Sequence, residues 1–141
     1  MCKVMITAAK PERLKIVSFL LRLAGWEVQS SDSLAEAVNY VKNADNNDTY
    51  FDLLVVTDYH SLAASMEERL FEAQCLESCA SLNRSISIVI SANQIDPVEK
   101  ECLKDLAKGE LEFCPADHLV SQIEHVHDQI SQRQMQMAQQ Q

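Results

Sequence analysis

Short apolar runs alternate along the chain with longer segments in which apolar side chains recur every three or four positions. The short runs predict buried β-strands, and the longer segments predict helices that pack against them. The five predicted strands are Val4–Thr7, Trp26–Gln29, Leu53–Val56, Ile86–Ile90 and Leu111–Cys114. Leu53–Val56 is apolar at every position, which is typical of a central strand in a parallel sheet with both faces covered.

Capping residues mark the ends of the predicted helices. The first helix begins at Pro11 and ends at Gly25, while Ser33–Glu36 and Ser65–Glu68 are capping boxes that open the second and third helices. The polar segment Asn43–Thr49 predicts a loop. The side chains expected to face the core are Leu14, Val17, Leu20, Leu21 and Ala24, then Leu34, Ala37, Val38 and Val41, then Leu70, Ala73, Leu76 and Ala80, and finally Leu119, Ile123, Val126 and Ile130.

Five strand–helix repeats without a hairpin signal predict a parallel sheet with helices on both faces. The fold class is α/β, a flavodoxin-like doubly wound five-stranded sheet of order 2-1-3-4-5. Ligands of such sheets bind at the carboxyl ends of the strands. Residues 1–130 are expected to form this single domain. The Gln/Met-rich tail, residues 131–141, is expected to extend the last helix or to be disordered.

Composition and charge exclude several classes of protein. Twelve basic residues against 21 acidic ones give a net charge of −9, so direct nucleic-acid binding is not expected. Two glycines are too few for a Gly-rich phosphate loop, and no apolar run is long enough to cross a membrane. Five cysteines without a disulfide spacing predict a reducing, cytoplasmic location. Cys75 and Cys79 have no second Cys or His pair to complete a zinc site, and we expect them to be small buried residues.

Several segments, in this order and spacing, resemble the receiver domains of response regulators. They are Val4–Pro11, Gly25–Val28, Ser33–Ala37, Val55–His60, Ile88–Asn93 and Phe113–Pro115. The resemblance implies a site at the carboxyl edge of the sheet. In the family, an acidic pair follows the first strand, the phospho-accepting aspartate follows the third, a Ser or Thr ends the fourth, and a Lys before Pro ends the fifth.

The site positions depart from the family pattern. Ala8 and Ala9 stand where the acidic pair belongs, and Cys114 stands where the lysine belongs. Only Asp58, the candidate phospho-acceptor, and Ser91 keep the family's residue types. Mg²⁺ prefers carboxylate, carbonyl and water oxygens, which alanine methyl groups cannot replace. We therefore expect no metal site and no cofactor.

Two positions have alternative assignments. Counting from Phe51 and Asp52, the usual family spacing places Thr57 at the acceptor position, whereas the residues that follow favour Asp58. Because the segment before Pro115 is short, either Leu111 or Phe113 takes the position of the family's switch aromatic residue.

These features predict a non-catalytic signalling and protein-interaction module of the two-component type, an atypical receiver that works by docking. Its partner would be a kinase, regulator or output domain that contacts the fourth helix, fifth strand and fifth helix, and a homodimer is compatible with the tail. The alternatives are a phospho-accepting receiver that uses Asp58, and a small-molecule or redox sensor in the vacated pocket near Cys114. An enzyme is not expected, because no set of nucleophile, base and orienting group is visible.

Overall fold

The computed structural model describes residues 3–7, 11–46, 50–57, 65–80, 86–91, 97–106, 111–114 and 118–139. Strands and helices alternate along these segments. The elements are β1 (Lys3–Thr7), α1 (Pro11–Leu23), β2 (Glu27–Ser31), α2 (Leu34–Asn46), β3 (Leu53–Val56), α3 (Met66–Ala80), β4 (Ser87–Ser91), α4 (Pro97–Leu106), β5 (Leu111–Cys114) and α5 (Leu119–Gln139). Across this described part of the chain, every helix is too short or too polar to pass through a membrane.

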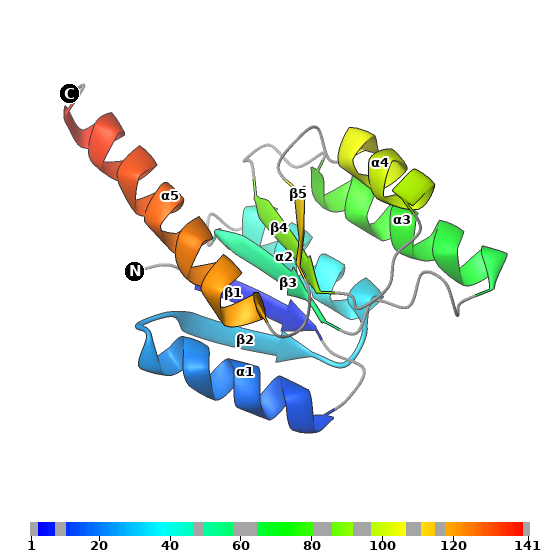
Figure 1. Ribbon diagram of the computed structural model, residues 1–141, viewed down its shortest axis with the longest axis horizontal. Coiled ribbons are helices and arrows are strands. Elements are labelled where there is room, and N and C mark those ends of the chain that lie inside the picture. Colours follow the sequence, from blue (N-terminus) through cyan, green and yellow to red (C-terminus); the bar gives the residue numbers. More distant parts are fainter. Residues whose placement is uncertain are drawn as a thin grey trace.

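The strands form a parallel sheet in the order β2-β1-β3-β4-β5, as predicted (Figure 1). All four residues of β3 are buried, which follows from its central place and its continuous apolar sequence. The sheet is therefore doubly wound. From β1 the chain adds β2 on one side, and it then crosses back to add β3, β4 and β5 on the other side of β1.

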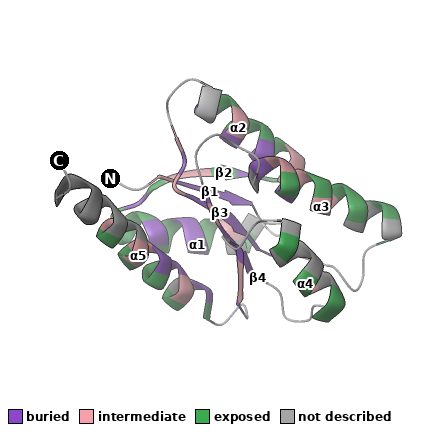
Figure 2. Ribbon diagram, turned by 90° about the horizontal axis from the view of Figure 1, so that it is seen from above, coloured by how far each residue is buried: buried purple, intermediate pink, exposed green. Residues whose placement is uncertain are grey.

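Two apolar cores cover the two faces of the sheet, as the buried strand residues in Figure 2 indicate. On one face, α1 and α5 pack through side chains such as Val17 and Ile123 onto β1 and β3. On the other face, α2 and α3 pack through side chains such as Val38 and Leu76. Helix α4 contacts α3 and β5, and therefore extends this second layer.

Local interactions at the helix ends agree with the predicted caps. The Ser33 hydroxyl accepts a hydrogen bond from the Glu36 amide at 3.2 Å, as a capping box requires. At the end of α1, the Trp26 amide donates to the Leu21 carbonyl and the Gly25 amide donates to the Arg22 carbonyl. Gly25 has φ +97°, so this Schellman turn needs the conformational freedom of glycine.

Helix α5 is anchored near its middle by Val126, which is buried, and by an aromatic contact. The rings of Trp26 and His127 meet edge to face with centroids 5.2 Å apart. The helix continues to Gln139, so residues 131–139, for which helix extension and disorder were both open, are helical. In Figure 1 this last part of α5 projects away from the sheet.

Four sequence predictions differ from the structure in detail. Leu20, Ala24 and Leu70 were expected to face the core but are exposed. In addition, α2 continues to Asn46 instead of giving way to a loop at Asn43. The helical pattern identified the helices correctly, but α1 is apolar on more than one face, so periodicity alone did not select the buried face.

Replacement of Leu54 by Ala should lower the free energy of unfolding by about 2–5 kcal/mol, because the side chain is completely buried in β3. The matched control is Leu23→Ala on the exposed face of α1, which should change stability by less than about 0.5 kcal/mol. Urea unfolding followed by circular dichroism measures both values. Equal losses for the two variants would contradict the described packing.

Candidate functional site

Polar side chains line up where three neighbouring strands end. In the sheet register Val56 pairs with Ile90, and Ser91 pairs with Cys114. Thr57, the residue after Val56, therefore lies in one row with Ser91 and Cys114 at the carboxyl edge of the sheet. Adjacent strands are about 4.8 Å apart, so Ser91 on the middle strand is next to both Thr57 and Cys114.

Thr57 is held against β1 by two hydrogen bonds to a single carbonyl group. Its amide donates to the Thr7 carbonyl oxygen at 2.9 Å, and its Oγ1 donates to the same oxygen at 3.0 Å. The side chain is buried. Its hydroxyl proton is therefore engaged by the backbone and the group is uncharged.

Cys114 closes the row on β5 and is also buried. Burial, and then the negative charge of Glu112, raise the pKa of the Cys114 thiol above its ordinary value. The thiol is therefore neutral at neutral pH. A redox sensor needs a lowered pKa, so this finding argues against the redox alternative.

Three residues of the predicted site, Ala8, Ala9 and Asp58, lie outside the described residues. The assignment of Asp58 as phospho-acceptor therefore stays a prediction. Of the two candidates for the acceptor position, Thr57 is the one that the structure describes in the row.

The residue types in the described row, Thr57, Ser91 and Cys114, fit a divalent cation poorly. The described row offers two hydroxyl groups and one neutral thiol, and contains no carboxylate. Neither alanine at positions 8 and 9 has a side-chain oxygen. Mg²⁺ sites usually include one or two carboxylates, and a thiol is a soft ligand that Mg²⁺ does not select.

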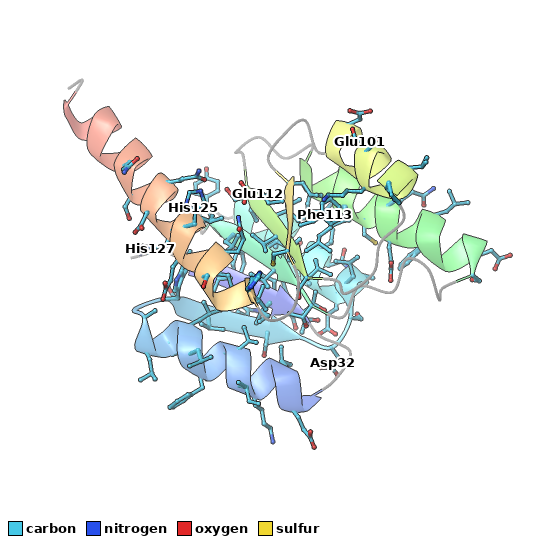
Figure 3. All side chains as sticks on the ribbon, in the orientation of Figure 1. Asp32, Glu101, Glu112, Phe113, His125 and His127 are labelled. Carbon is cyan, nitrogen blue, oxygen red and sulfur yellow. The ribbon has the colours of Figure 1, made fainter. Side chains whose placement is uncertain are left out.

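The two faces of β5 carry different contacts (Figure 3). Leu111 is buried in the core on the α2–α3 face of the sheet, and Phe113 packs against the same core with the Lys100 Nζ 5.5 Å from its ring centroid. On the opposite side, Gln122 of α5 donates a hydrogen bond to Glu112. Leu111 and Phe113 thus share one side, and Phe113 is the aromatic residue that contacts α4.

Of the two cysteines of α3, Cys79 is a buried core residue, as predicted, whereas Cys75 is only partly buried and packs against the core. Cys79 is completely buried, and burial raises the pKa of its thiol to about 12. Within the part of the chain that the structure describes, no three His, Cys, Asp or Glu side chains come close enough together to hold a metal ion.

Two buried polar residues next to the row were not singled out from the sequence. Thr7 ends β1 and Ser31 ends β2, and the two are paired in the register. The Ser31 hydroxyl donates to the Ser33 carbonyl at 3.1 Å and so shapes the turn into α2. In the sequence, the feature that could have identified them is the hydroxyl residue at the last position of β1 and of β2.

The sheet order and the helices on both faces define a flavodoxin-like doubly wound fold, the fold of receiver domains. The chain is similar to a response regulator receiver domain from Clostridium thermocellum, with a TM-score of 0.69 and 13% identity over 97% of this chain and 99% of that one. A chemotaxis response regulator of Vibrio cholerae matches with a TM-score of 0.67 and 17% identity over 89% and 98% of the two chains.

A further match is the receiver domain of a histidine kinase from Arabidopsis thaliana, solved in complex with Mg²⁺. Its TM-score is 0.64, with 16% identity over 89% of this chain and 91% of that one. No protein-family model matches the sequence. No curated protein matches it either. At these identities the likeness establishes the fold.

Iodoacetamide should modify Cys114 at pH 8 at least about 10-fold more slowly in the folded protein than in urea, because the thiolate is the reactive form and burial disfavours it. Peptide mass spectrometry measures the rate. Glu112→Gln should increase the rate, since it removes a charge that raises the pKa, while Glu124→Gln on the exposed side of α5 serves as control. Equal rates in folded and unfolded protein would restore the redox alternative.

Proposed function

We propose that the chain is a receiver-type signalling module of the two-component class that acts by binding a partner protein, without Mg²⁺-dependent phosphotransfer. One observation carries this proposal. The described row at the carboxyl edge is built from Thr57, Ser91 and Cys114. The resembling family has a Ser or Thr where Ser91 stands and a lysine where Cys114 stands, and its aspartate corresponds to Asp58 or, in the alternative alignment, to Thr57.

The chemistry of phosphoryl transfer explains why this row matters. The reaction needs a nucleophilic carboxylate and positive charge near the transferring oxygens. The Thr57 hydroxyl donates to the Thr7 carbonyl, and the Cys114 thiol is neutral, so neither residue supplies these functions. The alanines at positions 8 and 9 remove the metal ligands of the family.

The surface proposed for the partner is formed by α4, β5 and α5. Val98, Glu101 and Asp105 of α4 are exposed, and Phe113 of β5 is half-buried beneath Lys100. This surface combines apolar side chains with acidic ones, which supports a partner with a basic, partly apolar surface. The lysine above Phe113 would have to move for a partner to reach the ring.

Acetyl phosphate should leave the intact mass of the protein unchanged, with or without Mg²⁺, because the positive charge that lowers the barrier is missing. Mass spectrometry after donor treatment tests this. An adduct of phosphate mass that disappears in Asp58→Asn but persists in Thr57→Val would establish the phospho-accepting alternative. An adduct with the opposite dependence would assign the modification to Thr57.

Millimolar Mg²⁺ should not shift the melting temperature of the native protein, since stabilisation requires a difference in binding between folded and unfolded chains. A variant with Ala8→Asp, Ala9→Asp and Thr57→Asp should show a saturable rise, because it restores a carboxylate set at the sheet edge. The matched control keeps Ala8→Asp and Ala9→Asp but places the third aspartate at the exposed Ser30, as Ser30→Asp. A saturable rise in the native protein would contradict the proposed loss of the metal site.

A further inference from the structure

The outer face of α1 carries a row of exposed apolar side chains. Ile16, Phe19 and Leu23 are 61%, 60% and 69% exposed, and Leu20 between them is 39% exposed. Their spacing of three and four residues places them on one side of the helix, opposite the buried Val17 and Leu21. Half of the described large apolar residues that are exposed lie on this single helix.

The charges around this row are unusual for an acidic protein. The sequence of α1 contains three basic residues and one acidic residue, although the whole chain has a net charge of −9. Lys15 and Arg22 are exposed and seven residues apart, so they lie on the same side of the apolar row. Glu12 is also exposed and lies on the line of Ile16, Phe19 and Leu23. The outer face of α1 is therefore apolar and carries the positive charges of Lys15 and Arg22 against the one negative charge of Glu12.

The outer face of α3 has the complementary character. Leu70 and Phe71 are 56% and 53% exposed, and the exposed side chains of Glu67 and Glu77 lie on the same face, on either side of them along the helix. The sequence of α3 contains four glutamates and one arginine. This face is apolar with acidic ends.

Charge decides which of these faces can meet between two copies of the chain. Two α1 faces would bring the Lys15 and Arg22 side chains of both copies together, and two α3 faces would do the same with glutamates. A contact of α1 with α3 instead pairs opposite charges. Lys15 and Arg22 are about 10 Å apart along their helix and Glu67 and Glu77 about 15 Å, a difference that the long basic side chains can span.

We propose that the protein self-associates head to tail, with α1 of one copy docked on α3 of the next. The two helices lie on opposite faces of the sheet (Figure 2), so each copy keeps one of its two faces available after one contact. Such a heterologous contact produces chains of copies, or rings if the rotation closes.

The association should be weak and sensitive to salt. A standard interface takes about 800 Å² from each partner, which is more than one face of a short helix supplies. The charged margins are exposed and are screened as ionic strength rises. This contact is independent of the α4–β5–α5 surface, so it can fail without affecting the function proposed above.

The test is sedimentation velocity of the full chain from about 10 µM to about 1 mM. At low salt the weight-average mass should rise to at least about 1.5 times the monomer mass, and it should fall towards that of the monomer in about 0.5 M NaCl. A protein that stays monomeric throughout overturns the proposal and leaves the α1 face to a different partner.

Charge reversal tests the pairing itself. Lys15→Glu with Arg22→Glu makes both faces acidic, and Glu67→Lys with Glu77→Lys makes both faces basic, so each variant alone should be monomeric. An equimolar mixture should associate at least as strongly as the native protein, because each reversed face again meets an opposite charge. Glu101→Lys with Glu124→Lys, which alters the charge outside the two faces, is the matched control and should associate like the native chain.

Other outcomes contradict the proposal. Association that survives either reversal alone, or a dimer that does not grow with concentration, indicates a contact between identical faces. A mixture that stays monomeric rejects the pairing of α1 with α3. If a reversed variant fails to fold by circular dichroism, Phe19→Gln on α1 replaces it, and the salt dependence of the native chain remains decisive.

Discussion

The register between β1 and β3 is held at both ends of the two strands, and it determines which residues meet at the edge of the sheet. At the amino end, the Lys3 amide donates to the Asp52 carboxylate at 2.9 Å, and the Asp52 amide donates to the Lys3 carbonyl at 2.8 Å. The Lys3 ammonium lies 4.4 Å from the centre of the Phe51 ring. At the carboxyl end, Thr57 makes two hydrogen bonds to Thr7. A shift by one residue would break both ends and turn the apolar side chains of β3 to the wrong core.

The fold is held together by apolar packing and by strand pairing. The two apolar cores and the paired strands provide the stability, and none of them depends on charged residues at the carboxyl ends. A carboxylate row is costly to assemble because like charges repel at short distance. The uncharged side chains of Thr57, Ser91 and Cys114 avoid this cost, and the Thr57 hydroxyl donates to the Thr7 carbonyl instead. The stability of the domain therefore does not require a carboxylate row at this edge.

The sheet order was predictable because each strand is a distinct apolar run and parallel connections permit few topologies. The helix caps at Ser33 and Gly25 were also readable, since each needs a specific residue type. The exposure of Leu20 and Leu70 could not be predicted from the sequence. In a helix with apolar residues on several sides, tertiary packing decides which side is buried. The meeting of Ser91 and Cys114 at the carboxyl edge was expected from the resemblance and the strand order. Thr57 was only one of two candidates for the same edge, because local spacing did not determine the last residue of β3.

The projecting end of α5 has a mechanical consequence. Val126 is the last side chain of this helix described as buried, and the contact between His127 and Trp26 lies beside it. From there to Gln139 the axis extends by about 20 Å. Because a helix is stiff over this length, a tilt of about 10° at the Trp26 contact displaces the far end by about 3 Å. A small tilt of α5 at the contact between Trp26 and His127 would therefore produce a larger displacement at the far end of the helix.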